Sequence, residues 1–274
     1  MTNPYILPQG NVLISFSGGR TSGFMLRQII ESNNGIPVRA KVVFANTGRE
    51  MPETLDFVHE CGERWNVPIT WLEYARADNK VTFDVVNHNS ASRRGEPFDA
   101  VLAKTGILPN VFRRFCTQEL KVKTIKRYLA SVGWKNWTNT VGIRADERHR
   151  VKPSSDNRWT NWFPLAVDEM TKRDVMGFWS KQPFDLRVVK GGGNCDGCFL
   201  KSEATLAAMW REHPERMQWW ADVEQRKSQQ TGKKCSFHDS RTYADLGSFV
   251  AKQGDWIFDD ESFLCQTDGG ECTG

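Results

Sequence analysis

The first 75 residues alternate short apolar runs with longer segments of helical periodicity. Apolar runs at residues 12–16, 40–45 and 69–74 predict strands, and residues 22–32 and 52–65 space their apolar positions as amphipathic helices do. This alternation is typical of a Rossmann-like, mostly parallel sheet with helices on both faces, here of the adenine nucleotide alpha-hydrolase type. Ligands bind such α/β sheets beyond the carboxyl ends of the strands.

The later pattern is less uniform. Residues 78–108 show no clear period and contain a turn-rich surface segment, whereas residues 117–130 predict a helix. Residues 140–143 predict a further strand that brings residues 144–148 to the same sheet edge. Thr171 is the expected N-cap of a helix over 171–180, and residues 204–225 predict a longer helix interrupted near Pro214.

The composition changes after residue 151, because seven of the eleven tryptophans follow it. We therefore expect an α/β nucleotide-binding domain over residues 1–150 and a smaller cysteine-bearing subdomain over residues 151–274. The surplus of tryptophan indicates either core packing or the interface of a homo-oligomer.

Length and composition exclude some classes of protein. The 274 residues are 39% hydrophobic but contain no apolar run of about 18 residues, and the first nine residues lack a signal-peptide layout. We expect a cytoplasmic protein without membrane association. The net charge of +4 does not by itself indicate a nucleic-acid partner. Six lysines and arginines nevertheless lie close together in the sequence with only Glu119 as an opposing charge: Arg113, Arg114, Lys121, Lys123, Lys126 and Arg127. This pattern indicates either an anion site or a solvated helix face.

The segment after the first predicted strand carries the strongest chemical pattern. Gly18 and Gly19 let the backbone approach an anion closely, and the start of the next helix supplies amide donors and a partial positive charge. The candidate nucleotide-binding residues of this segment are Ser15, Ser17, Gly18, Gly19, Arg20, Thr21 and Ser22. The alternative is an ordinary glycine-rich strand-to-helix turn. The segment resembles the Ser-Gly-Gly-x-Asp-Ser loop of the PP-loop ATP pyrophosphatases, with Thr21 in place of Asp.

Seven cysteines without a secretory signal favour metal or redox chemistry over a disulfide framework. Cys195 and Cys198 have the spacing of a half-site for a soft metal, and a redox pair is the alternative. Cys116 lies at a predicted helix start among cations, which lowers a thiol pKa. Cys265 and Cys272 supply further thiols. We assign Cys116, Cys195, Cys198 and Cys265 to a [4Fe-4S] cluster, with zinc as the alternative metal.

Cys265 and Cys272 could exchange roles in this assignment. Cys61 lies in an apolar helical pattern, so we expect it to be buried.

Several motifs occur in the order found in the phosphoadenosine phosphosulfate reductase family, which the chain resembles over residues 10–200. Besides the Ser-Gly-Gly loop they are Asn46-Thr-Gly48, the Arg-x-Cys-Thr-x-x-Leu-Lys segment around Cys116, Gly142-Ile-Arg144 and the late Cys-x-x-Cys pair. The resemblance is in particular to short members of phage or plasmid origin.

The resemblance implies roles for individual residues. Thr47 and Gly48 would border the adenosine, and Arg144 and Arg148 would meet the anionic end of the substrate as catalytic residues. Cys116, Cys195 and Cys198 match cluster-ligand positions of the iron-sulfur reductases of the family. Two departures are evident. Those reductases have adjacent cysteines where this chain has Phe115 and Cys116, and their terminal Glu-Cys-Gly reads Glu-Cys-Thr-Gly over residues 271–274.

Three functions fit these patterns. In the first, the enzyme binds ATP with Mg²⁺, adenylates an acceptor that could be a nucleic acid, and transfers sulfur from a persulfide on Cys272 or a sulfide held on the cluster, with a cysteine desulfurase as a candidate partner. In the second, Cys272 attacks the sulfur of adenylyl sulfate or its 3'-phosphorylated form, and thioredoxin resolves the product. In the third, the chain is a nucleotide-binding regulator.

Overall fold

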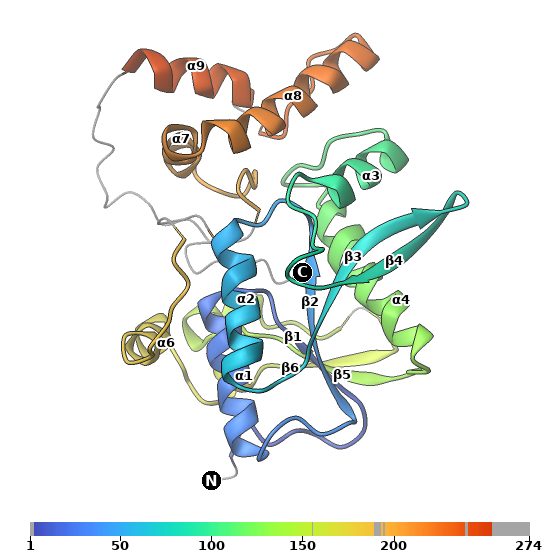
Figure 1. Ribbon diagram of the computed structural model, residues 1–274, viewed down its shortest axis with the longest axis vertical. Helices are drawn as coiled ribbons and strands as arrows, with labels where there is room; N and C mark the ends of the chain where they lie inside the picture. The colour runs from blue at the N-terminus through green and yellow to red at the C-terminus, as the bar shows by residue number, and fades with distance from the viewer. Residues whose placement is uncertain (1–2, 155, 189–192, 194, 239–240, 254–274) are drawn as a thin grey trace.

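The computed structural model describes residues 3–154, 156–188, 193, 195–238 and 241–253, and these residues form a layered α/β structure (Figure 1). The sheet in this part of the chain has the strand order β4-β3-β2-β1-β5-β6. Only the β3–β4 pairing is antiparallel, so the sheet is mostly parallel as the sequence predicts. The strands are β1 (Val12–Ser15), β2 (Ala40–Asn46), β3 (Ile69–Ala77), β4 (Lys80–Val86), β5 (Trp137–Thr140) and β6 (Trp159–Trp162).

Helices cover both faces of this sheet. The helical segments are α1 (Arg20–Ser32), α2 (Pro52–Arg64), α3 (Glu96–Thr105), a π-helix (Thr117–Val122), α4 (Lys123–Ser131), a 3₁₀ segment (Ala145–Arg150), α5 (Pro164–Val167), α6 (Lys172–Trp179), α7 (Glu203–Glu212), α8 (Pro214–Thr231) and α9 (Tyr243–Gln253). Alternate residues of β1 explain the two layers, because a strand points successive side chains to opposite faces. Ile14 packs with α1 and α2, while Leu13 belongs to the cluster on the α4 side.

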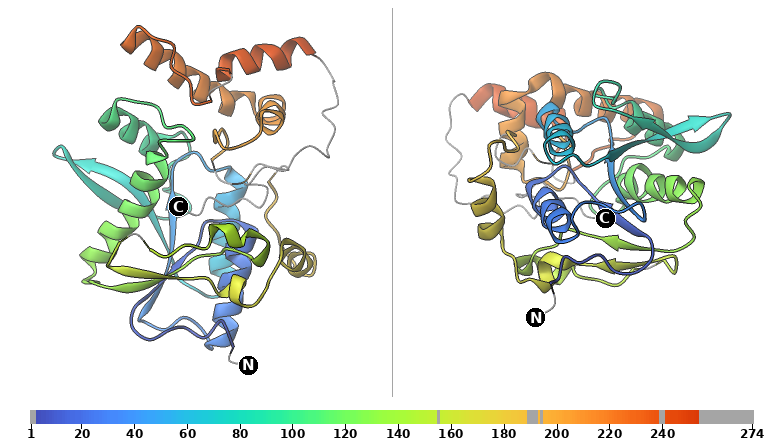
Figure 2. Two further views of the ribbon diagram at one scale, coloured as in Figure 1. Left: turned by 180° about the vertical axis from the view of Figure 1, so that it is seen from behind. Right: turned by 60° about the horizontal axis from the view of Figure 1, so that its bottom comes forward.

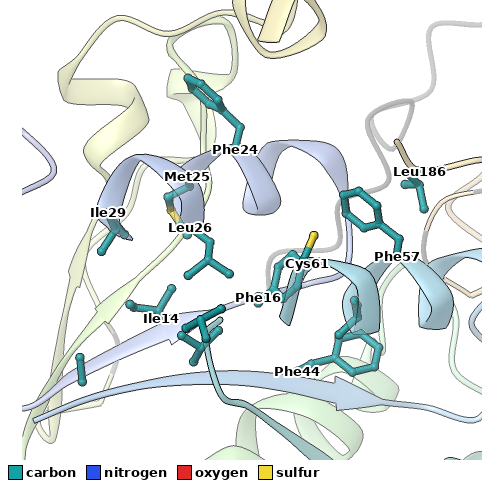
Figure 3. Close-up of a cluster of buried hydrophobic side chains, with 14 of the residues drawn as sticks. Ile14, Phe16, Phe24, Met25, Leu26, Ile29, Phe44, Phe57, Cys61 and Leu186 are labelled. Carbon is teal, nitrogen blue, oxygen red and sulfur yellow. The ribbon is translucent and has the colours of Figure 1, made fainter. Parts of the chain in front are cut away.

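The larger core lies between the sheet and the helices α1 and α2. Figure 3 shows Ile14 and Phe44 of the strands facing Leu26 of α1 and Cys61 of α2. Cys61 is fully buried there, as expected, and desolvation raises the pKa of its thiol. Burial of this kind at about 25 cal/mol per Å² of apolar surface is the main stabilising contribution to such a sheet.

A second hydrophobic cluster packs α7, α8 and α9 against α3 and the π-helix. The three helices lie together at one end of the molecule (Figure 2). Trp220 of α8 and Tyr243 of α9 meet Phe98 of α3 and Leu120 of the π-helix in this cluster. By contrast, β6 is a strand of the sheet, and α6 packs into the larger core. The sheet therefore continues past residue 150.

Most of the predicted elements are confirmed. The helices α1 and α2 and strands β1 to β3 lie where the periodicity indicates, Thr171 caps α6, and Pro214 separates α7 from α8. The strand predicted over residues 140–143 is wrong, because β5 ends at Thr140 and the Ile143 amide then donates to the Val141 carbonyl in a tight turn. The irregular segment expected over 78–108 is also wrong, since it contains β4 and α3.

Among the described helices, none combines the length and apolarity that crossing a membrane requires.

Candidate functional site: an anion-binding cavity at the carboxyl edge of the sheet

A cavity of about 1070 Å³ lies where β1 separates the two halves of the sheet. It is bordered by Ser15 at the end of β1 and Ser17 beyond it, by Asn139 of β5 and Val141 beyond it, and by the π-helix. This is the position at which open α/β sheets bind ligands, because the strand order reverses there and leaves a crevice. The volume is at the upper end of the range for small-molecule sites.

Cations dominate the lining of this cavity. Among the described residues, seven lysine or arginine side chains and two histidines line it, against the single carboxylate of Asp156. These cations are Arg114, Lys121, Lys123, Lys126, Arg150, Lys152 and Lys201. An enclosed surface with this excess of one sign concentrates ligands of the opposite charge. The cavity therefore suits an anionic ligand.

The Ser-Gly-Gly loop reaches the cavity through Ser17 alone among its described residues, and it has a compact internal geometry. The Ser22 hydroxyl lies 2.9 Å from that of Ser17, accepts from the Ser17 amide at 3.2 Å and donates to the Gly19 carbonyl at 3.0 Å. Gly18 has φ +81°, and a Cβ there would lie 2.8 Å from the Thr54 methyl group. Only glycine fits this position without strain.

The start of α1 follows directly on this loop. Gly19 is the N-cap, no side chain caps the helix, and the first turn contains no acidic residue. The helix dipole is therefore not compensated by a carboxylate of its own first turn, which is the arrangement that binds phosphate groups.

Arg144 is held against this loop rather than left in solvent. Its Nη1 donates to the Thr21 hydroxyl at 2.9 Å, and its Nε donates to Asp146 at 3.0 Å. Arg144 is only 6% exposed and also pairs with Glu147 at 3.3 Å. The structure thus brings Arg144 and Thr21 together. Arg148 instead lies at the surface, where it contacts Glu169 at 3.3 Å.

Three other predicted nucleotide-binding residues point elsewhere. Arg20 makes a two-pronged pair with Asp185 at 2.7 and 2.9 Å and ties the start of α1 to the segment after α6. Thr47 contacts the Cys195 thiol, and a Cβ on Gly48 would meet Pro97 of α3 at 2.8 Å. Of the predicted nucleotide-binding residues, only Ser15 and Ser17 line the cavity in the described part of the chain.

Sequence reasoning missed a ladder of polar side chains on the cavity floor. The Ser15 hydroxyl donates to Asn139 Oδ1 at 2.8 Å, and Asn139 Nδ2 donates to Asn161 Oδ1 at 3.2 Å. All three side chains line the cavity and come from β1, β5 and β6. Only the pairing of these strands reveals the ladder, since more than 120 residues separate Ser15 from Asn139.

The Cys195 thiol lies behind the cavity, beside the loop that follows β2. The Thr47 hydroxyl is 3.2 Å from Cys195 Sγ, and Glu50 forms an isolated antiparallel bridge with Cys195. Desolvation raises the pKa of this thiol, and the Glu50 carboxylate raises it further, while Lys121 lowers it. Cys116 lies close enough to contribute to the same shift.

Asp196, between the two cysteines of the Cys-x-x-Cys pair, is the best-connected group of this region and was not predicted. Its fully buried carboxylate accepts from Arg49 at 2.6 Å, from Arg216 at 2.6 Å and from the Trp220 indole at 2.6 Å. Its central place in a Cys-x-x-Cys sequence was the only available signal. Asp196 thus fixes the cysteine loop to both the β2 loop and α8.

The described residues do not by themselves assemble a metal site. Within them, no group of three or more His, Cys, Asp or Glu side chains could hold a metal ion. Cys265 and Cys272 lie outside the described residues. The [4Fe-4S] cluster, the alternative zinc and the catalytic role of Cys272 therefore stay predictions.

The basic cluster around Cys116 is partly neutralised by buried carboxylates. Glu119 pairs with Lys123 at 2.6 Å and with Lys104 at 3.1 Å. Desolvation alone would raise the pKa of Glu119, but the hydrogen bonds from these two lysines outweigh it and lower the pKa. Lys126 pairs in turn with Asp156.

The fold, the loop and the cavity define an α/β protein with a cationic cavity at the carboxyl edge of its sheet. Comparison with known proteins identifies its relatives. Residues 11–179 match the phosphoadenosine phosphosulfate reductase domain family, so the chain belongs to that family. The resemblance inferred from the motifs is confirmed.

Two similar proteins extend this comparison. The chain is 32% identical over 197 residues to the uncharacterized nin region protein ORF290 of Escherichia phage lambda, and the match covers 69% of this chain and 66% of that protein. The chain thus spans just under two thirds of the length of its phage relative. The crystal structure of a phosphoadenylyl-sulfate reductase from Candida auris in a phosphate complex is 13% identical, with a TM-score of 0.41 over 62% of this chain and 72% of that one.

Proposed function

We propose that this chain binds ATP in the cationic cavity and adenylates an acceptor with release of pyrophosphate, which prepares the acceptor for sulfur transfer. The observation that carries the proposal is the uncapped start of α1, which follows the Ser-Gly-Gly loop, together with the cavity that Ser17 of this loop borders and whose described lining includes seven lysines and arginines. A polyphosphate is the ligand that best matches amide donors, a helix dipole and this density of cations.

The chain's own residues bind and stabilise charge in this reaction. The loop amides and the first turn of α1 hold the phosphates, and Arg144 positions Thr21. An acceptor oxygen attacks the α-phosphorus, the bond to the bridging oxygen breaks, and pyrophosphate leaves with the negative charge. Fixed donors that face this leaving group supply the main catalytic effect. The Mg²⁺ expected with ATP stays a prediction.

The second step replaces oxygen by sulfur. A hydrosulfide ion attacks the activated carbon of the acceptor, the carbon–oxygen bond breaks, and AMP carries the oxygen away. If a cysteine desulfurase delivers the sulfur as a persulfide, a further thiol must cleave the sulfur–sulfur bond to release the product.

The terminal Glu271-Cys272 sequence supports a second candidate, the reduction of adenylyl sulfate or phosphoadenylyl sulfate with thioredoxin. That reaction needs a thiol that reaches the bound sulfur. The candidate thiol, Cys272, lies outside the described residues.

The test compares the two reactions on the full chain purified without oxygen. Adenylation predicts pyrophosphate release from labelled ATP, whereas reduction predicts sulfite release from adenylyl sulfate in the presence of thioredoxin. Thr21→Val removes the hydroxyl that Arg144 holds and should slow the productive reaction roughly fivefold, the equivalent of about one hydrogen bond. Thr231→Val, at the exposed end of α8, is the matched control. Nucleotide binding without either product would favour a regulator and overturn the proposal.

A further inference from the structure

A segment at the border of the cavity leaves large apolar side chains in solvent. Within six residues, Ile107 is 41% exposed, Val111 is 42% exposed and Phe112 is 85% exposed. Val111 and Arg114 line the cavity, so Phe112 stands at its edge. Single exposed apolar residues are ordinary, but a contiguous exposed group marks an interaction site.

The same border is basic on its solvent side. The side chains of Arg113, Lys123, His149 and Lys152 are exposed. The last three of them also line the cavity. Arg113 and Lys152 take part in none of the ion pairs formed among the described residues. The carboxylate that pairs with Lys123 belongs to Glu119, which is only 6% exposed and faces inward. The border therefore presents cations and an aromatic ring to solvent.

A second aromatic surface continues into the cavity. Trp159 stacks on Trp137 with ring centroids 5.2 Å apart and an interplanar angle of 16°, and both rings line the cavity. Lys126 Nζ lies 5.6 Å from the centroid of the Trp159 ring. Phe112 outside and Trp159 inside thus give two aromatic platforms that are flanked by cations.

We infer that the rim formed by Phe112, Arg113, Lys123, His149 and Lys152 binds single-stranded nucleic acid. Cations pair with the phosphates, while a base stacks on Phe112, because every base has a face that an aromatic ring can cover. A duplex is disfavoured, since a base must leave its stack before it can enter an enclosed site. An acidic peptide would use the cations but not the aromatic platforms. The role of this nucleic acid as acceptor rests on the proposed adenylation. Its binding to the rim does not depend on that reaction.

The experiment measures the binding of a fluorescein-labelled 20-nucleotide single strand, as RNA and as DNA, to the full chain by fluorescence anisotropy. The same sequence as a duplex and an acidic peptide of equal net charge serve as competitors. Phe112→Ala should weaken single-strand binding roughly tenfold, as the loss of one stacked base does. Lys152→Gln should lower the slope of log K against log salt by about 0.7, the contribution of one phosphate contact to a single strand.

Matched controls lie on exposed positions away from the cavity lining. Val38→Ala removes a side chain that is 97% exposed, and Lys80→Gln removes a cation at the exposed start of β4. Neither change should alter the binding. Circular dichroism checks that each variant is folded, which the exposure of Phe112 favours.

The outcomes separate this inference from the proposed function. Equal binding by the wild type and Phe112→Ala, or stronger binding of the duplex or the peptide, overturns the rim as a single-strand site even if ATP is split. Specific single-strand binding without pyrophosphate release supports the rim while the proposed adenylation fails. Pyrophosphate release that rises in proportion to the added single strand supports both.

Discussion

Asp196→Asn provides the most direct test of how the cysteine loop is held. The substitution keeps the shape of the side chain and removes its charge, which faces the guanidinium groups of Arg49 and Arg216. The Asp196 side chain is 0% exposed and that of Arg49 is 4% exposed, so water cannot replace the lost carboxylate. Desolvation already lowers the pKa of Arg49, which shows how costly its charge is in this position.

The expected loss follows from these contacts. Removing one partner of a buried ion pair typically costs about 3–5 kcal/mol of unfolding free energy. Arg49 keeps a hydrogen bond to the Arg216 carbonyl at 2.8 Å and lies 4.6 Å from the centroid of the Trp219 ring. Because these contacts remain, and because asparagine can still accept from Trp220, we expect a loss near the lower end, about 3 kcal/mol.

Urea unfolding followed by tryptophan fluorescence measures this loss, since Trp220 donates directly to Asp196. Glu60→Gln is the control, because Glu60 forms an exposed pair with Arg64 on α2 and its removal should cost at most about 0.5 kcal/mol. The midpoint should shift for Asp196→Asn without a change in slope. A loss equal to that of the control would refute the view that Asp196 anchors the loop.

Further predictions concern buried groups elsewhere. Burial raises the pKa of Glu224 from 4.5 to about 7 despite hydrogen bonds from the Phe237 and Tyr243 amides. The folded state therefore binds the proton more tightly, so stability should fall by at most about 3 kcal/mol as pH rises from 4.5 through 7, and Glu224→Gln should flatten this dependence in urea titrations at several pH values. Gly18→Ala should lose ATP binding measured by calorimetry, since its Cβ meets Thr54 at 2.8 Å and φ is +81°; unchanged affinity would contradict the cradle. Cys61→Ser should destabilise the fold by about 1–3 kcal/mol in urea titrations because it buries an unpaired hydroxyl, whereas Cys61→Ala should leave ATP binding intact.

The sequence predicts the parts of the fold that local periodicity determines. In α1 and α2 the apolar positions recur on one face, and the same face packs on the sheet, so local and tertiary preferences agree. The apolar run at 141–143 resembles a strand equally well. The predicted strand does not form there because the chain turns toward the cavity after Thr140. Only the pairing with the neighbouring strand β6 reveals where β5 ends.

The candidate site divides in the same way. The Ser-Gly-Gly loop was predictable because glycine, hydroxyl and helix-start signals lie within eight residues. The Asp196 cluster was not, because its donors Arg49 and Arg216 lie 147 and 20 residues away and no spacing rule links them. Thr47 was assigned to the nucleotide by resemblance, and the structure instead shows its hydroxyl beside the Cys195 thiol.

Glu50 connects the cavity with this thiol. Its Oε2 accepts from the Thr47 amide and hydroxyl at 2.8 and 2.7 Å, while its Oε1 lies 3.7 Å from Lys121 Nζ. Lys121 lines the cavity, and its charge lowers the pKa of Cys195 that Glu50 raises. An anion bound beside Lys121 competes with Glu50 for the same ammonium group, and its own charge also disfavours the thiolate. Because Glu50 is only 2% exposed, solvent screens this coupling weakly. Lys121 and Glu50 thus form a contact between the cavity lining and the surroundings of the Cys195 thiol.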